Sequence, residues 1–312
     1  MTDTADLTIS DTPTAKPPPA PTPVPRHRSR RWRDAAVGYL FLIPSAIIFG
    51  VFFFYPLVRL FYLGLHQQNR FGTSERYVGW SQFGDVLTGD EFTSGLQISA
   101  KYVLFTVPLG LVLGVLLAVA ANRRLKGIKI FQTIFSSTVA SSVAVASVVF
   151  LVLLNPQVGY FSNVSFLSLS DPDTALRGVA LSSVWQNLGL TFIIVLAGLQ
   201  AVPDEINEAA TLDGYGPIRR FFRVTLPLIS PTLMFLVVVL VIFALQAFAQ
   251  SDILTAGGPV GATETLVYKI FYSQQPSDQG TGSVIAIGLF GITLFVTLAQ
   301  FLLLDRRVHY GN

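Results

Sequence analysis

The side chains that could hydrogen-bond a small molecule occur at two places inside apolar stretches. Gln186 and Asn187 follow Trp185, and Gln246 precedes Gln250 by four residues, which puts these two on one face of a predicted helix. Amides surrounded by hydrocarbon need hydrogen-bond partners and usually face the interior of a helical bundle. We therefore expect these four amides, Gln186, Asn187, Gln246 and Gln250, to face a central path, and hydrogen bonds between helices explain them about as well.

No residues have the spacing of a catalytic or metal site. The chain has no cysteine, which excludes disulfides and thiolate metal sites. His27, His66 and His309 are far apart and outside the apolar runs, as expected of solvated loop histidines. A G-x-x-x-x-G-K-[ST] phosphate loop is absent, as are paired carboxylates or a Ser/His/Asp set at a plausible depth. We expect no enzymatic activity, cofactor or metal on this chain.

The polar segment Pro203–Pro231 lies between two apolar runs and has clear helix signals. Pro203 suits a first helical position, and the carboxylates after it suit the positive end of the helix dipole. Gly214 and Gly216 are expected to end this helix, and Gly214 to take a positive φ. Pro217 can then begin a second helix that carries three basic residues, Arg219, Arg220 and Arg223. The segment is predicted to be a docking helix followed by a basic arm.

This segment resembles the EAA loop of bacterial ABC importer permeases, through Glu208-Ala209-Ala210, Asp213-Gly214 and Val224-Thr225-Leu226-Pro227. Val224 replaces the usual isoleucine of that family, and Tyr215 replaces a common alanine. The resemblance implies a coupling helix seated in a cleft of a separate ATPase subunit, which would bind the ATP and Mg²⁺. It assigns the coupling role to Glu208, Ala209, Ala210, Asp213, Gly214, Arg219 and Arg220. An ordinary polar connection between helices is the alternative.

The elements around these residues are predicted to be membrane spans. The chain is 51% hydrophobic and 12% charged, too apolar for a soluble domain. A spanning helix needs about 20 apolar residues, and six uncharged stretches qualify: Ala35–Val58, Tyr102–Ala121, Ile130–Leu154, Gly178–Val202, Thr232–Gln250 and Gln279–Leu304. We predict an all-α, six-span membrane protein in a lipid bilayer, and the resemblance implies the fold of type I ABC importer permeases.

Basic residues alternate between the two sides of these spans. They are concentrated in Arg26–Arg33, Arg123–Lys129, Arg219–Arg223 and Arg306–Arg307, whereas the other connections hold few. Since cytoplasmic loops carry the excess of Lys and Arg, both termini and Pro203–Pro231 are predicted to be cytoplasmic. The same distribution removes the reason to expect a nucleic-acid partner.

The predicted domain organisation has three parts. Residues 1–34 form a proline-rich and arginine-rich cytoplasmic tail, predicted to be disordered because it holds seven prolines between Pro13 and Pro25. Residues 35–307 form the permease domain, and residues 308–312 a short cytoplasmic tail.

Two external segments resemble the carbohydrate-uptake subfamily of these permeases. Residues 77–83 resemble its aromatic "FVGLxNF" element, which could pack on the outer leaflet or touch a partner. The loop that starts at Leu254 resembles its "LTxGGP" element, which implies that Gly257, Gly258 and Pro259 face an external binding protein. The expected partners are that binding protein, a second homologous permease and two ATPase subunits.

The substrate is indicated only by resemblance. Residues 216–222, 258–263 and 266–270 look like the first permease subunit of glycerol 3-phosphate and glycerophosphodiester importers. A phosphate usually binds Arg or Lys, but Arg59 and Lys101 at the outer helix ends are the nearest candidates. A neutral di- or oligosaccharide remains the alternative substrate. An ion-coupled secondary transporter is the alternative class, although the spans hold none of the acidic residues or histidines such proteins use.

Overall fold

The computed structural model describes residues 28–123 and 125–305. The predicted disordered tail and the C-terminal tail lie mostly outside these residues. The chain divides into two units, Met1–Pro56 and Leu57–Asn312. We describe them separately.

The first unit holds α1 (Arg28–Phe49) and the π-helical turn η1 (Gly50–Phe54), and α2 (Tyr55–Gly64) continues the same helix into the second unit. Together they give an uninterrupted apolar helix over Gly38–Gly64. The π-turn precedes Pro56, which has no N–H to donate to the preceding turn. The amide of Tyr55 donates to the carbonyl of Gly50 five residues back, so the helix continues through the proline.

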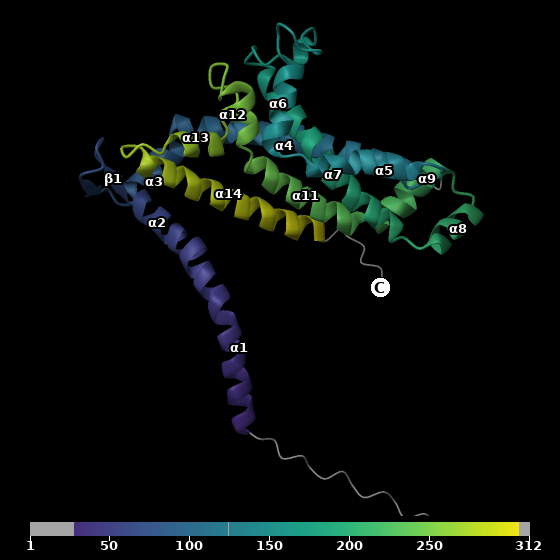
Figure 1. The fold of residues 1–312 in the computed structure, drawn as a ribbon, viewed down its shortest axis with the longest axis horizontal. Helices are drawn as coiled ribbons and strands as arrows, with labels where there is room; N and C mark the ends of the chain where they lie inside the picture. The colour runs from purple at the N-terminus through teal and green to yellow at the C-terminus, as the bar shows by residue number, and fades with distance from the viewer. Residues whose placement is uncertain (1–27, 124, 306–312) are drawn as a thin grey trace, which may run out of the picture. The chain divides into compact units, whose positions relative to one another are not determined.

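The second unit is built around four long helices, α4 (Asp90–Ala121), α7 (Ala175–Gln200), α11 (Ser230–Leu245) and α14 (Gln279–Asp305), which run alongside one another (Figure 1). Helices α4 and α7 approach closely at Gly114, where an added Cβ would overlap the side chain of Thr191. Small residues permit such close packing between membrane helices. Two apolar clusters fill the bundle, one around Tyr102 and Leu266 and the other around Phe192 and Leu236.

Two of the predicted spans are not single straight helices. The stretch Ile130–Leu154 is divided into α5 (Ile128–Ser136) with the 3₁₀ turn η2 (Ser137–Ala140) and then α6 (Val143–Leu153), and the two halves are bent by 104°. The bend occurs where Ser141 is extended and the hydroxyl of Ser142 caps α6 by accepting the amide of Val145 at 3.2 Å. The prediction of one continuous helix was wrong here.

The predicted fifth span, Thr232–Gln250, is also interrupted. Helix α11 ends at Leu245, and a separate helix α12 (Ala249–Thr255) follows. At its other end α11 is bent by 70° from the segment that ends at Leu228. Among the described residues, four helices are long and apolar enough to cross a membrane, or six segments if each bent pair counts as one span.

Short elements connect the spans. Strands β1 (His66–Gln68) and β2 (Glu75–Tyr77) pair antiparallel, with His66 opposite Tyr77, and the helix α3 (Ser81–Thr88) follows. The later connections hold the 3₁₀ turn η3 (Ser165–Leu167) and α13 (Leu266–Tyr272). The hairpin of β1 and β2 is an exception to the predicted all-α fold.

Candidate functional site

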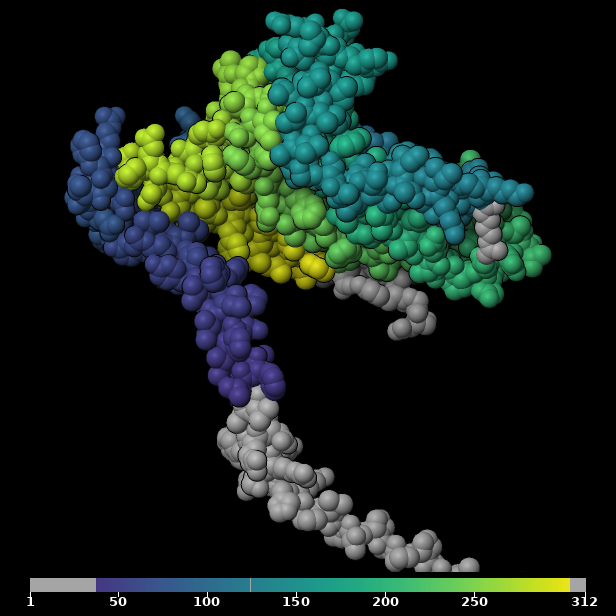
Figure 2. All heavy atoms as spheres, in the orientation of Figure 1, coloured from purple at the N-terminus to yellow at the C-terminus, as the bar shows by residue number. Residues whose placement is uncertain are grey.

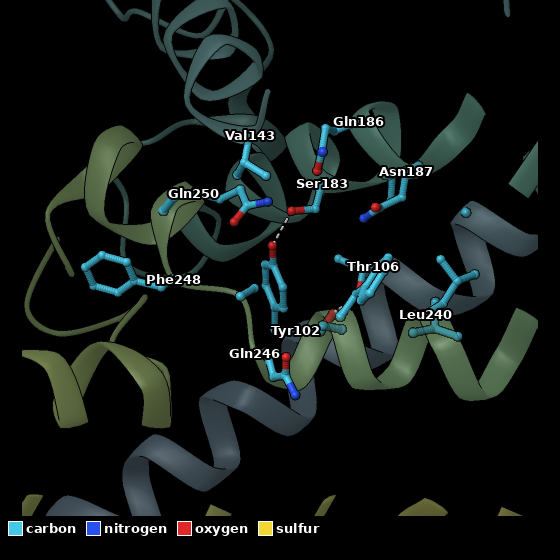
Figure 3. Close-up of a pocket in the computed structure, with 17 residues that line it drawn as sticks. Tyr102, Thr106, Val143, Ser183, Gln186, Asn187, Leu240, Gln246, Phe248 and Gln250 are labelled. Atoms are coloured by element: carbon cyan, nitrogen blue, oxygen red, sulfur yellow. Dashed lines mark hydrogen bonds between the residues drawn. The ribbon is translucent and has the colours of Figure 1, made fainter. Parts of the chain in front are cut away.

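A cavity of about 520 Å³ lies among α4, α6, α7, α11 and the start of α12 (Figure 3). All four predicted amides line it. Gln186 and Asn187 come from α7, Gln246 from the residue that ends α11, and Gln250 from α12. The structure therefore brings together residues 64 positions apart (from Gln186 to Gln250), and their role in transport remains a proposal.

The reason given for pairing Gln246 with Gln250 was wrong. The chain breaks between α11 and α12, so the two side chains do not share one face of a continuous helix. They reach the same cavity from different elements, and Gln250 is only 6% exposed. Within the described residues, none of the four side-chain amides forms a hydrogen bond with the protein. Their donors and acceptors are free to bind a ligand or water.

Three hydroxyl groups that the sequence analysis missed also line the cavity. The hydroxyls of Tyr102 and Ser183 are hydrogen-bonded to each other, and the hydroxyl of Thr106 donates to the carbonyl of Tyr102 at 2.7 Å. Tyr102 is fully buried in α4, and Ser183 lies on α7. A signal was present for Ser183, since residues 183, 186 and 187 have the spacing of one helical face. Tyr102 had no such signal.

Among the residues that the structure describes, no acidic or basic side chain lines the cavity. Lys101 is exposed and outside it, and the guanidinium of Arg59 instead lies 4.9 Å above the ring of Tyr62. Arg177 lies 6.0 Å from the ring of Phe105. The cavity is therefore suited to neutral groups that donate and accept hydrogen bonds, with apolar surface beside them.

The predicted docking helix is α8 (Asp204–Leu212), which lies at one end of the bundle (Figure 1 and Figure 2). Pro203 lies just before this helix. The prediction that Pro203 occupies the first helical position was therefore wrong. The helix ends in a Schellman motif, in which the amide of Tyr215 donates to the carbonyl of Ala210 and that of Gly214 to Thr211, both at 3.0 Å. Gly214 has φ +79°, which confirms the predicted left-handed conformation.

The basic arm follows as α9 (Pro217–Arg220), the π-helical turn η4 (Phe221–Thr225) and α10 (Leu226–Leu228). Pro217 begins α9, as predicted. Two arginines turn back toward the docking helix. Arg220 donates to the hydroxyl of Thr211 at 2.8 Å, and the guanidinium of Arg219 lies 4.7 Å above the ring of Tyr215. These contacts fix the arm against α8.

The surface of this segment combines carboxylates with apolar side chains. Glu208, Ala209 and Asp213 are exposed, whereas Ala210 is buried and faces the protein. Leu212 is 89% exposed, and three other apolar side chains on the segment are exposed as well: Ile206, Ile218 and Phe222. Exposed apolar residues rimmed by charges are typical of a protein-binding surface.

The glycine-proline loop after α12 is a well-fixed turn. Gly257 has φ +80° and is buried where any Cβ would overlap the ring of Tyr268, while Gly258 and Pro259 are half-buried. The hydroxyls of Thr255 and Thr263 are hydrogen-bonded at 2.6 Å. The adjacent Val260 is 95% exposed. The three predicted residues shape the loop, and Val260 is the side chain that the loop presents.

A bundle of apolar helices with a cavity of neutral polar side chains is typical of a membrane transport protein. The chain belongs to the family of inner membrane components of binding-protein-dependent transport systems, whose model matches residues 110–310. It is therefore a multi-pass inner membrane protein and a permease subunit of an ABC importer, the non-catalytic membrane part of the transporter, for which no cofactor is expected on this chain.

Relatives that share one description occur in several bacteria. The chain is 32% identical over 281 residues to the "sn-glycerol-3-phosphate transport system permease protein UgpA" of Agrobacterium fabrum. The aligned residues cover 88% of this chain and 96% of that protein. The protein of that name from Yersinia enterocolitica is 32% identical over 282 residues, with 87% and 95% covered.

A solved structure has the same fold. A chain of a bacterial ABC transporter involved in the import of the acidic polysaccharide alginate matches with a TM-score of 0.74, at 20% identity, over 89% of this chain and 99% of that chain. The likeness confirms the predicted type I importer permease fold. Its low identity carries no information about this chain's substrate.

Proposed function

We propose that this permease carries glycerol 3-phosphate or a glycerophosphodiester such as glycerophosphocholine. The observation that supports this most is the match to relatives described as sn-glycerol-3-phosphate permeases, at 31–32% identity over nearly their whole length. The amides and hydroxyls of the cavity suit the glycerol part of such a substrate, because each hydroxyl both donates and accepts a hydrogen bond.

The neutral lining of the cavity favours a second candidate, a neutral di- or oligosaccharide. A phosphate is bound most strongly by Arg or Lys, and none lines this cavity. For the phosphate-bearing substrate to fit, its charge must be held by the second permease or by the external binding protein. The two candidates therefore differ in what the partner chains supply.

The proposed assembly contains this chain, a second homologous permease, two copies of a P-loop ATPase subunit and an external substrate-binding protein. The alginate transporter has been solved in complex with a substrate-bound periplasmic protein, which supports an external partner of this kind. We call Pro203–Pro231 the coupling segment. Glu208, on its exposed surface, would meet a basic group in a cleft of the ATPase. Gln186, Asn187, Gln246 and Gln250 would face the substrate, and Gly257–Pro259 would shape the loop that faces the binding protein.

The orientation is proposed from the basic residues, with both termini and the coupling segment in the cytoplasm. Reporters fused after Lys126 or Arg219 should then read cytoplasmic, and reporters near Gly89 or Gly261 should read external. One inverted reporter among the four would contradict this topology.

The substrate proposal is tested with the cognate binding protein and the reconstituted transporter. Thermal stabilisation of the binding protein is measured with glycerol 3-phosphate, glycerophosphocholine, maltose and a trisaccharide, and uptake of the stabilising ligand into proteoliposomes follows. We expect stabilisation and ATP-dependent uptake of the phosphate-bearing compounds. Stabilisation by the saccharides alone would replace the first candidate by the second.

A further inference from the structure

Residues His66–Trp80, which we call the outer hairpin, belong to neither the cavity nor the coupling segment. This segment contains β1 and β2 and leads into α3. Three of its aromatic side chains are largely exposed: Phe71 by 83%, Tyr77 by 64% and Trp80 by 67%. Arg70 and Arg76 are exposed as well, and neither forms an ion pair or hydrogen bond with the described part of the chain.

Local interactions hold the outer hairpin in one conformation. Asn69 spans the turn, donating to the hydroxyl of Thr73 at 2.8 Å and accepting its amide at 2.9 Å. The carboxylate of Glu75 accepts hydrogen bonds from Tyr62 at 2.9 Å and Gln68 at 2.8 Å. The bond from the Tyr62 hydroxyl is the main reason that the pKa of Glu75 lies below its usual value. Glu75 is therefore engaged within the protein, and the two arginines remain available to an outside anion.

The outer hairpin follows an apolar helix, Gly38–Gly64, that is long enough to cross a membrane. Near the end of this helix, the guanidinium of Arg59 lies over the Tyr62 ring, where a long basic side chain can reach the headgroups. His66 stacks on Tyr62 with ring centroids 4.0 Å apart. His66 begins β1 two residues after Gly64 ends α2, and two residues of chain span at most about 7 Å. The headgroup layer on each side of a bilayer is about 5–7 Å thick.

We propose that the outer hairpin is seated on the membrane surface and binds anionic phospholipid headgroups. Trp and Tyr are enriched at this level of the bilayer, where the ring body is apolar and the polar edge is hydrated. Arg70 and Arg76 supply guanidinium groups, which bind phosphate through paired N–H donors. The rigid turn presents these groups without an ordering cost at the moment of contact. The outer hairpin adjoins the end of this apolar helix in either orientation of the chain.

The first test locates Trp80 relative to the lipid in the assembled transporter. The chain has three tryptophans, and the variant Trp32→Phe/Trp185→Phe leaves Trp80 as its only one. In nanodiscs, we expect quenching of Trp80 fluorescence by lipids brominated near the headgroup, weaker quenching by lipids brominated near the chain end, and little quenching by aqueous iodide. The contribution of Trp80 is checked as the difference between the native chain and Trp80→Phe, which also removes any signal from partner subunits.

The second test concerns the lipid charge. The same quenching is compared between brominated phosphatidylglycerol and brominated phosphatidylcholine, each as a minor component of the nanodisc. We expect phosphatidylglycerol to quench at least about two-fold better and the difference to vanish in Arg70→Gln/Arg76→Gln. The matched control Arg123→Gln, in the turn after α4, should leave the ratio unchanged.

Three outcomes would overturn the proposal. Full access of Trp80 to iodide with no quenching by lipid would mean that the outer hairpin lies in water. Protection of Trp80 from iodide that appears only when the binding protein is added would show that the hairpin is a protein-docking surface. Equal quenching by the two lipids would show that the hairpin does not prefer anionic headgroups. None of these readings depends on which substrate the transporter carries.

Discussion

The cavity and the coupling segment are two polar regions of an apolar chain, and they are built from different kinds of side chain. The cavity is lined by amides and hydroxyls, of which Gln250, Tyr102 and Ser183 are buried, and no ionic group among the described residues lines it. The coupling segment exposes Glu208 and Asp213 and carries arginines beside them. A charge inside the bilayer is costly, whereas an exposed charge on the membrane surface costs almost nothing. In the proposed function, charge is therefore placed where the ATPase would be recognised, and neutral donors are placed where the substrate would pass.

The two regions also differ in how far their hydrogen bonds are already made. In the coupling segment the Schellman motif and the bond from Arg220 to Thr211 fix the backbone before any partner arrives. In the cavity, the amides of Gln186, Asn187, Gln246 and Gln250 have no partner among the described residues. A docking surface gains affinity from being preorganised, and a transport cavity needs groups that can bind and release. The four predictions below test this difference.

The largest effect is expected from Gly214→Val. Gly214 has φ +79° and nothing within 4 Å of an added Cβ, so the strain would come from the backbone alone. A left-handed conformation costs an ordinary residue about 1–2 kcal/mol and a β-branched residue more. We expect the end of α8 to change, with loss of uptake and of ATPase pull-down, while the permease stays in the membrane. Gly214→Asn is the matched control, because Asn tolerates this conformation, and it should retain most uptake. Equal loss in both variants would contradict the backbone explanation.

A comparable loss is expected from Glu208→Lys. The carboxylate is exposed on α8, and in the proposed complex it meets a basic group in a partly shielded cleft, where an unpaired or like charge is strongly unfavourable. Uptake and pull-down of the ATPase are measured together, and both should be lost. Asn207→Ala on the same helix should have little effect, and reversing the charge of the ATPase partner residue should restore uptake. Normal uptake by the Lys variant would show that this segment is only a connection.

An intermediate effect is expected in the cavity. Gln250→Leu removes a buried amide that faces the cavity, and the loss of one substrate hydrogen bond should lower uptake about tenfold. Gln186→Leu, Asn187→Leu and Gln246→Leu should act in the same direction, without loss of assembly. The control is Gln300→Leu on α14, a residue that does not line the cavity and whose amide oxygen is buried without a partner. If transport and substrate-stimulated ATPase activity persist in all four variants, the path lies elsewhere.

The smallest effect is expected from Arg220→Gln, which shortens the side chain that bridges from α9 to Thr211 on α8. One partly exposed hydrogen bond from a charged donor contributes about 1 kcal/mol. Substrate-stimulated ATPase activity should therefore fall by at most about fivefold, while ATPase pull-down persists. Thr211→Val removes the acceptor and should have the same effect, and the double variant should be no worse than either single variant. Additive losses would show that Arg220 acts through another contact, such as the ATPase.

The sequence was sufficient to predict the structure at positions where a residue type has one usual structural role. Gly214 and Pro217 indicated where α8 ends and α9 begins, and long uncharged runs indicated the helices of the bundle. Hydropathy could not indicate the bend after η2, because the segments on both sides of Ser141 and Ser142 are apolar enough to read as one span, and only the cap of α6 marks the bend. The same limit hid the break between Gln246 and Gln250. Tyr102 and Ser183 are 81 residues apart, and only tertiary packing brings their hydroxyls together.

The bend between η2 and α6 has a consequence for the synthesis of the protein. The helical segment before it spans Ile128–Ala140, and α6 has 11 residues, whereas crossing the hydrocarbon takes about 20. Neither half is long enough to be inserted alone, but the 26 residues from Ile128 to Leu153 are. We therefore expect the insertion machinery to receive one apolar segment and the 104° bend to form after release into the lipid. Ala146, Ser147 and Phe150 of α6 are buried, so we expect this part of the permease to acquire its final shape only when neighbouring helices are present.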